Sequence, residues 1–236
     1  MSFDPSLCLS TTLPLAKAAY DKSLLPTGWE IVAAIEPDDF GFVFRKIDPA
    51  TGDIIVAIGI PGTRNLEQWL WDFDNLPVGG LYGVLGHVHK GFQDAYSRIR
   101  TSLFAGLAGL DYDELWVIGH SLGGALAQLL ARELAMRFKL AMTDGPKILC
   151  DPVLWTFESP RPWCVDAVAC FNQTVSTAWL IENHADIVPR LPPEAEGFKT
   201  GNTVILLQPP MSTDAHVNHA LATCAQGLQK LIAATS

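Results

Sequence analysis

The chain has 236 residues, of which 49% are hydrophobic and 17% charged, and its formal net charge is −9. This balance excludes a basic patch that could displace counterions from nucleic acid, and it disfavours electrostatic binding to anionic membranes. The apolar content predicts a large buried core rather than a disordered chain. Because roughly 200–250 residues commonly form one α/β domain, we expect a single domain over residues 1–236.

The cysteines and the first twenty residues give an indication of the cellular compartment. The five cysteines are irregularly spaced and form no C-x-x-C pair, so we expect them to be mostly reduced and buried: Cys8, Cys150, Cys164, Cys170 and Cys224. The first twenty residues lack a basic segment followed by an apolar run, and no stretch of about 18 apolar residues could span a bilayer. A cytoplasmic address is the default expectation, although a processed exported chain would look the same.

Strand patterns dominate the first part of the chain. A helix is expected around residues 13–25, followed by strands at 30–34 and 41–47 and by a hairpin turn at 48–53. Residues 54–60 are continuously apolar and β-branched, which is typical of a central strand buried on both faces.

Helices and strands then alternate. Apolar residues three or four positions apart predict a helix through Phe92, Tyr96, Ile99 and Leu103, and an i+4 series predicts a long helix from Leu122 to Phe138. Further strands are expected at 115–118, 153–157, 177–182 and 203–207, and a last helix at 220–233. This order predicts an α/β fold, with a mainly parallel sheet flanked by helices on both faces and an active site at the carboxyl edge of the strands.

The segment Gly119-His120-Ser121-Leu122-Gly123 matches G-x-S-x-G. A buried strand is expected directly before it and an apolar-periodic helix directly after it, which is the setting of a nucleophile elbow. Ser121 is therefore the predicted nucleophile, and the start of the following helix would stabilise an oxyanion there. His120 is predicted to be a packed neighbour rather than the base.

A serine hydroxyl needs a histidine to take its proton and a carboxylate to stabilise the imidazolium. In this fold the acid follows the serine and the histidine comes last. Asp186 lies just beyond a predicted strand and is the expected acid, so His184 comes too early to be the base. We favour His219 as the base, because it directly precedes the apolar stripe of the last helix, and keep His216 as the alternative.

Backbone N–H groups should hold the developing oxyanion. One donor is expected to be Leu122, directly after the nucleophile, and the other should come from the loop after the strand at 54–60. That loop contains Gly62 and Thr63, and Thr63 could offer both its N–H and its hydroxyl.

Taken together, these motifs resemble those of the class 3 lipase family, which includes fungal triacylglycerol lipases and feruloyl esterases. The resemblance runs through most of the chain and rests on Gly62-Thr63-Arg64 with Trp69 and Asp72, on Val88-His89-Lys90-Gly91-Phe92 with Tyr96, and on residues 119–127, 156–161 and 186–192. It implies an α/β-hydrolase fold with Ser121 as nucleophile, Asp186 as acid, and Thr63 and Leu122 as oxyanion donors. His89 would be a structural residue near the site.

Three positions depart from the family pattern. Pro61 stands where the family often has Arg, Glu158 stands where it usually has Gly, and the aromatic residue expected after the catalytic histidine is absent or replaced. The departures affect the pocket wall and the choice of histidine, and they leave the expected reaction unchanged.

The resemblance also implies a lid at residues 64–75. Its apolar side chains are unusual for a segment near solvent: Leu66, Trp69, Leu70, Trp71 and Phe73. An ordinary core helix would explain the same pattern.

We therefore expect a lipase or carboxylesterase that hydrolyses acylglycerols or fatty-acyl esters through an acyl-enzyme, without a cofactor or metal. Its partner would be a small ester or lipid, met at a lipid–water interface, and neither nucleic acid nor a transmembrane segment is expected. The alternatives are a phospholipase A1 and a feruloyl or aryl esterase. A non-catalytic binding module on the same fold is the remote alternative.

Overall fold

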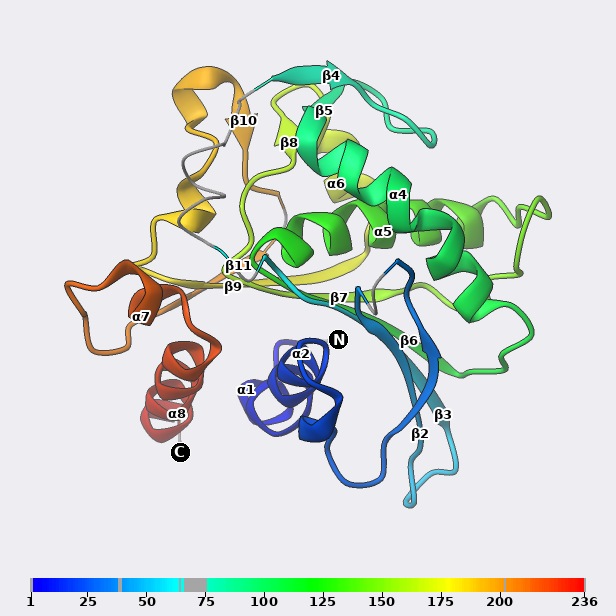
Figure 1. Ribbon diagram of the computed structural model, residues 1–236, viewed down its shortest axis with the longest axis horizontal. Coiled ribbons are helices and arrows are strands. Elements are labelled where there is room, and N and C mark those ends of the chain that lie inside the picture. The colour runs from blue at the N-terminus through cyan, green and yellow to red at the C-terminus, as the bar shows by residue number, and fades with distance from the viewer. Residues whose placement is uncertain (1, 38–39, 64, 66–75, 202, 236) are drawn as a thin grey trace.

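The computed structural model describes residues 2–37, 40–63, 65, 76–201 and 203–235. Within them a seven-stranded sheet has the order β1-β2-β3-β6-β7-β9-β11 (Figure 1). The strands are β1 (Glu30–Ala34), β2 (Phe42–Ile47), β3 (Ile54–Ile60), β6 (Glu114–His120), β7 (Val153–Phe157), β9 (Thr177–Asn183) and β11 (Thr203–Leu207). The pairs from β3 to β11 are parallel, whereas β1, β2 and β3 form an antiparallel meander. The predicted, mainly parallel sheet is confirmed.

Helices cover both faces of this sheet (Figure 1). On one face lie α4 (Lys90–Leu107), α5 (Leu122–Lys139) and α6 (Val168–Thr174), and on the other lie α1 (Pro5–Leu7), α2 (Leu13–Ala18) and α8 (Leu221–Thr235). Alternate residues of β3 enter different cores: Val56 and Ile58 pack with the α4 and α5 side, and Ile55 and Ala57 with the α2 and α8 side. Burial on both faces explains why this strand is apolar throughout.

Three parts of the fold differ from the expectation. The N-terminal helix is not a single helix over 13–25: it begins at α1, passes through the π-helical η1 (Cys8–Thr12) into α2, and is followed by a 3₁₀ turn, η2 (Lys22–Leu24). A short helix, α7 (Ala215–His219), precedes α8, whereas the last helix was expected only from residue 220. A second sheet, β10-β8-β5-β4, was not predicted because its strands are too short for a periodic pattern: β4 (Pro77–Gly79), β5 (His87–His89), β8 (Trp163–Cys164) and β10 (Phe198–Lys199).

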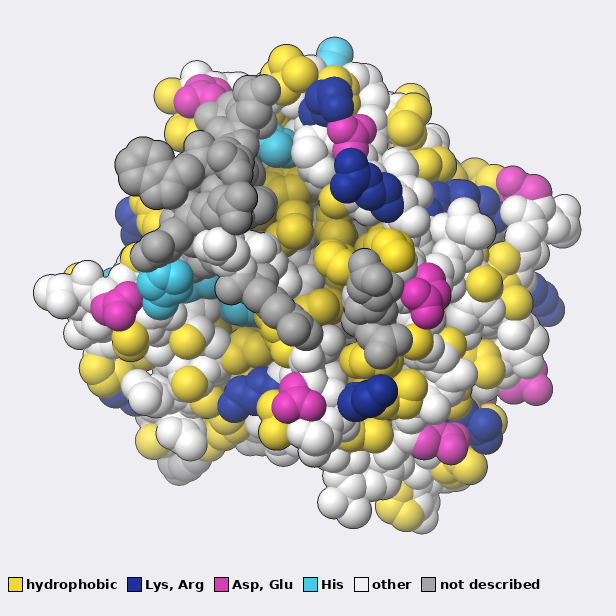
Figure 2. All heavy atoms as spheres, viewed as in Figure 1, with side chains coloured by type: hydrophobic (Ala, Val, Ile, Leu, Met, Phe, Trp, Pro, Cys, Tyr) yellow, Lys and Arg dark blue, Asp and Glu magenta, His cyan; other side chains and the backbone are white. Residues whose placement is uncertain are grey.

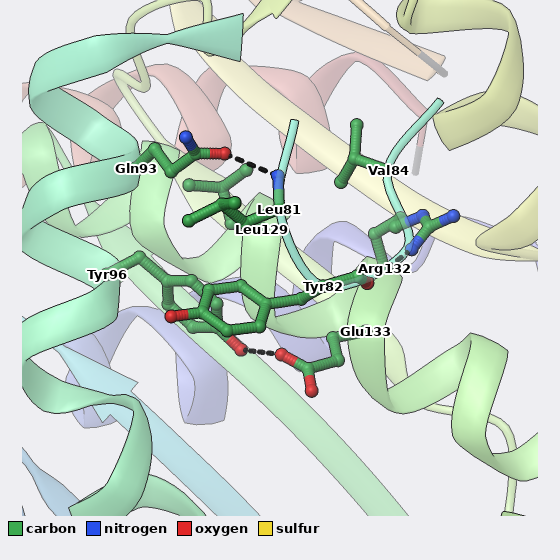
Figure 3. Close-up of a pocket in the computed structure, with 8 residues that line it drawn as sticks. All are labelled: Leu81, Tyr82, Val84, Gln93, Tyr96, Leu129, Arg132 and Glu133. Carbon is green, nitrogen blue, oxygen red and sulfur yellow. Dashed lines mark hydrogen bonds between the residues drawn. The ribbon is translucent and has the colours of Figure 1, made fainter. Parts of the chain in front are cut away.

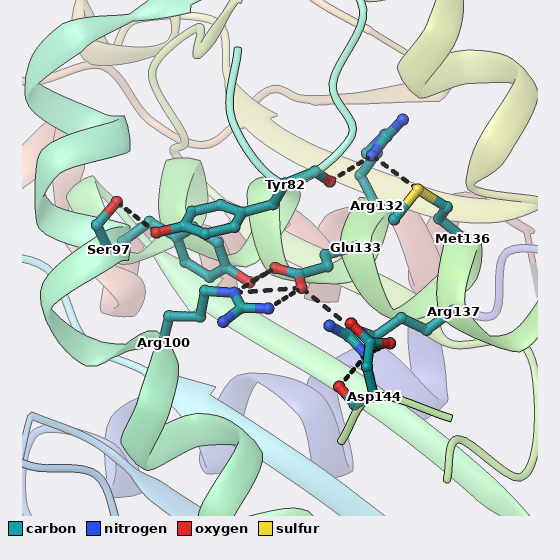
Figure 4. Close-up of polar contacts among 9 residues, drawn as sticks. Tyr82, Ser97, Arg100, Arg132, Glu133, Met136, Arg137 and Asp144 are labelled. Atoms are coloured by element: carbon teal, nitrogen blue, oxygen red, sulfur yellow. Dashed lines mark hydrogen bonds and ion pairs between the residues drawn. The ribbon is translucent and has the colours of Figure 1, made fainter. Parts of the chain in front are cut away.

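A buried ion-pair network joins α4 to α5 (Figure 4). Glu133 is 2% exposed and accepts hydrogen bonds from the Tyr96 hydroxyl at 2.7 Å, from Arg100 Nη2 at 2.5 Å and from Arg137 Nε at 3.1 Å. Beside the network lies a cavity of about 10 Å³, too small for a substrate, which Tyr82 and Tyr96 line together with Glu133 (Figure 3). The network therefore serves the packing of the two helices.

Replacing Glu133 by alanine should lower the free energy of unfolding by roughly 3–5 kcal/mol. The Arg137 guanidinium would lose its buried carboxylate partner and keep only the exposed Asp144, and the buried Tyr96 hydroxyl would lose its acceptor. Urea denaturation followed by circular dichroism measures the change. The control is Glu30→Ala, which removes an exposed ion pair with Arg45 and should cost less than about 1 kcal/mol. Equal losses in the two variants would contradict the structural role of Glu133.

Among the described helices, none has the length and apolar character that a membrane-spanning segment requires.

Candidate active site

Ser121 occupies the sharp turn between β6 and α5. It lies at the N-terminus of α5 with φ 56° and ψ −130°, a backbone conformation that residues other than glycine rarely adopt. Gly123 allows this turn, because a Cβ atom there would lie 2.2 Å from the carbonyl oxygen of Ile60. The turn has the strained strand-to-helix geometry of a nucleophile elbow.

The loop after β3 lies against this serine. A Cβ atom added to Gly62 would come within 2.6 Å of Ser121 Cβ, so the Gly62 backbone packs closely against Ser121. Thr63 follows in the same loop, and its hydroxyl accepts a hydrogen bond from Asn65 N–H at 3.2 Å. Leu122 is the first residue of α5. The loop thus contacts Ser121 through Gly62, and the helix start follows Ser121 directly. The oxyanion roles of Thr63 and Leu122 stay predictions.

Asp186 and His219 form a buried pair. Asp186 Oδ2 lies 2.6 Å from His219 Nδ1, and the two residues are 2% and 5% exposed. Asp186 Oδ1 accepts a hydrogen bond from Val188 N–H at 3.0 Å, which holds the carboxylate in place. When Nδ1 donates to a carboxylate, Nε2 is left to accept a proton. Within the described part of the chain, His219 Nε2 and Ser121 Oγ are buried without a hydrogen-bond partner.

The other candidate histidines lie elsewhere. His216 is exposed on α7, and its N–H donates to Asp214 at the start of that helix. His184 is half-buried, and its carbonyl accepts from Arg190. His89 is buried and caps α4 by accepting from Phe92 N–H. His219, by contrast, is the histidine that pairs with Asp186.

A chain of hydrogen bonds that the sequence did not predict connects the oxyanion loop to the histidine. Gly62 N–H donates to the Tyr20 hydroxyl at 2.6 Å, this hydroxyl lies 2.6 Å from His120 Nδ1, and His120 Nε2 lies 3.0 Å from the His219 carbonyl. Burial lowers the pKa of His120 to about 3, so its ring is neutral and can accept at Nδ1 while donating at Nε2. Burial also raises the pKa of Tyr20 to about 12, which keeps its hydroxyl proton. We call this chain the Tyr20–His120 relay.

Two asparagines fix the segment before His219. Asn183 Nδ2 donates to the Asn218 carbonyl at 2.7 Å, and Asn218 exchanges hydrogen bonds with the backbone of Ser212. Neither asparagine belongs to a motif that sequence inspection would select. Glu158 differs from the two asparagines, because its departure from the family glycine marks this position as unusual in the sequence.

The five apolar residues of the predicted lid, Leu66, Trp69, Leu70, Trp71 and Phe73, lie outside the described residues. On the face shown in Figure 2, hydrophobic side chains line a central hollow and histidine side chains lie at its edge.

The sheet order and the elbow at Ser121 define an α/β-hydrolase fold, and comparison with known proteins agrees. The family model described as Lipase (class 3) matches residues 57–196, more than half of the chain, so the protein belongs to the class 3 lipase family.

Individual relatives support the same assignment. A lipase from Rhizomucor miehei is 34% identical over 152 residues, which cover 61% of this chain and 39% of that protein. A secreted mono- and diacylglycerol lipase from Fusarium solani is 27% identical over 157 residues, covering 64% of this chain and 43% of the relative. This chain thus matches about two fifths of the length of these relatives.

Among solved structures, a triacylglycerol lipase described as having a serine protease triad at its catalytic centre is 25% identical, with a TM-score of 0.68. The similarity covers 87% of this chain and 79% of that one. The expected cytoplasmic address gains no support from these comparisons, since one of the relatives is by name a secreted protein.

Proposed function

We propose that this protein is a serine-dependent lipase that hydrolyses acylglycerols or fatty-acyl esters through Ser121, His219 and Asp186. The observation that carries the proposal is the buried Asp186–His219 pair, held beside the strained, buried Ser121 by His120, whose ring lies 3.0 Å from the His219 carbonyl. Membership of the class 3 lipase family supports it. The name of the Fusarium relative supports export rather than a cytoplasmic address.

The mechanism is acyl transfer in two steps. Ser121 Oγ attacks the ester carbonyl carbon while His219 Nε2 takes the hydroxyl proton, and Asp186 stabilises the imidazolium that forms. The N–H groups of Leu122 and Thr63, together with the Thr63 hydroxyl, hold the oxyanion. The C–O bond to the alcohol then breaks, and the alcohol leaves with the proton from His219. Water attacks the acyl-enzyme with His219 again acting as base, which releases the acid and restores the serine.

Two exposed apolar side chains, each near the acid or the base in the sequence, support a lipid substrate. Ile187, which follows Asp186, and Val217, on the same short helix as His219, are each 47% exposed. Apolar side chains at these positions favour contact with an acyl chain or a lipid surface.

The test combines a fluorophosphonate label with a substrate panel. A catalytic serine should bind the label covalently, and mass spectrometry should find it on the peptide that contains Ser121. Hydrolysis rates across p-nitrophenyl esters of increasing chain length, a diacylglycerol, a phospholipid and a feruloyl ester then identify the substrate class. A preference for the phospholipid or the feruloyl ester would replace the lipase assignment by the corresponding alternative, and an unlabelled serine would indicate a binding module.

Thr63→Val should lower kcat by roughly 10²–10³-fold and change KM little, because the hydroxyl should bind the oxyanion more strongly than the ground-state carbonyl. Steady-state kinetics on a p-nitrophenyl ester measures both constants. Thr51→Val is a matched control: in the hairpin after β2, its hydroxyl accepts from Asp53 N–H at 3.2 Å, as Thr63 does from Asn65. A change confined to KM would place Thr63 in substrate binding instead.

A further inference from the structure

Glu158 is a buried carboxyl group at the carboxyl end of β7, close to the proposed triad. Its side chain is fully buried, and its backbone has a φ of 51°, a left-handed conformation that favours glycine. Strain of this kind persists only where the surrounding contacts hold the residue in place.

Its contacts join four parts of the fold. Both carboxyl oxygens accept from Asn183 N–H on β9, at 2.9 and 3.0 Å, and Oε1 accepts from the Cys224 thiol on α8 at 2.9 Å. The Asp186 side chain raises the pKa of the same carboxyl group, both by its charge and as a hydrogen-bond partner. Glu158 therefore reaches both triad partners through Asn183. The Asn183 carbonyl accepts from Asp186 N–H at 3.0 Å, and the Asn183 side chain binds the Asn218 carbonyl, just before His219.

Two neighbouring carboxyl groups inside a protein do not both ionise readily at neutral pH, because their charges repel and water is excluded. Burial, and then the charge of Asp186, raise the pKa of Glu158 well above its usual range, against smaller opposing effects of Cys224 and Asn183. Both Asp186 oxygens already act as hydrogen-bond acceptors, Oδ2 toward His219 and Oδ1 toward Val188 N–H. The shared proton is thus held by Glu158, which gains an O–H group to donate.

We propose that Glu158 is a positioning residue for the triad: as a neutral acid it donates a hydrogen bond to the Asp186 carboxylate and holds, through Asn183, the segment that carries His219. The inference rests on the proposed function. Because this hydrogen bond withdraws charge from Asp186, it weakens the attraction of Asp186 for the protonated imidazole. The enzyme then keeps a neutral, active histidine at lower pH.

Other titratable groups around this cluster also affect a pH profile. Glu182 on β9 is half-buried, and burial raises its pKa to about 7. Among the described residues, His219 and His120 act on Asp186, Cys8 acts on Cys224, and Arg161 and Arg190 act on Glu182. Because Glu182 titrates near neutrality, all variants are best compared in a Glu182→Gln background.

The first variant is Glu158→Gln, which mimics the neutral acid: its amide can accept from Asn183, donate to Asp186 and keep the same backbone strain. We expect kcat within about threefold of the parent and an unchanged acidic midpoint of kcat/KM, since a neutral side chain replaces a neutral side chain. A midpoint moved to lower pH would overturn the proposal, because it would show that the variant had removed a negative charge beside Asp186.

The second variant is Glu158→Gly, which relieves the backbone strain and deletes the carboxyl group. We expect kcat to fall by up to roughly 100-fold with KM unchanged, because the acid and the base lose their alignment. The acidic midpoint should rise by roughly 0.5–1 pH unit, the equivalent of one hydrogen bond to Asp186. Parental kcat and an unchanged midpoint in Glu158→Gly would overturn the proposal.

A third measurement does not depend on activity. In protein carrying ¹³C at the glutamate carboxyl carbons, one signal should remain at the position of a protonated acid at pH 7 and should be missing from Glu158→Gln. Its absence from the parent spectrum would overturn the inference even if Glu158→Gly fails to fold. Failure of the proposed function is distinguishable. A protein that has no esterase activity, and whose Ser121 does not react with the label, could still show the protonated carboxyl signal.

Discussion

Ser121→Ala should lower kcat/KM for a p-nitrophenyl ester by roughly a million-fold, because the variant has no atom to attack the carbonyl. The unfolding curve should stay close to that of the wild type, since Ser121 Oγ has no hydrogen-bond partner in the described structure to lose. The same variant should no longer react with a fluorophosphonate.

A matched control is Ser102→Ala on α4, where the hydroxyl accepts from Glu36 N–H. We expect this variant to keep its activity, so that loss of a serine hydroxyl alone is not the cause of the defect. Turnover by purified Ser121→Ala at the wild-type rate would contradict both the nucleophile and the proposed function.

The second large effect distinguishes the two histidines that the sequence left open. His219→Ala should reduce kcat by roughly a million-fold, comparable to loss of the nucleophile, because the two residues act as one unit. His216→Ala should cost less than about tenfold, since His216 is exposed and its N–H caps α7 through Asp214. Steady-state kinetics of the two variants, with circular dichroism as a check of folding, makes the comparison. The reverse order of effects would move the base to His216 and leave Ser121 and Asp186 in place.

Much of the central sheet could be predicted from the sequence. β3 was predictable because both of its faces are buried, so that its residues are apolar without alternation. The elbow was predictable because its glycines meet a local steric requirement. Gly123 has no room for a side chain beside the backbone at the end of β3. Local requirements of this kind restrict the residue type at a fixed sequence position, so they can be recognised from the sequence.

Features that depend on distant contacts left no such mark. Tyr20 lies 100 positions before His120, and nothing around Tyr20 indicates that its hydroxyl would meet that ring. The acid and the base were placed by their order in the chain, and the structure pairs Asp186 with His219. Helix α7 was missed because five residues capped by Asp214 give too short a pattern for a periodicity argument.

The Tyr20–His120 relay has a consequence for folding kinetics. It connects residues near the beginning, middle and end of the chain, namely Tyr20, Gly62, His120 and His219. Contacts between residues so far apart form slowly, because loop closure must precede them. Enzyme activity would therefore be one of the last properties to return after denaturant is removed, later than helical circular dichroism, and the delay would report the docking of the N-terminal segment onto the assembled sheet.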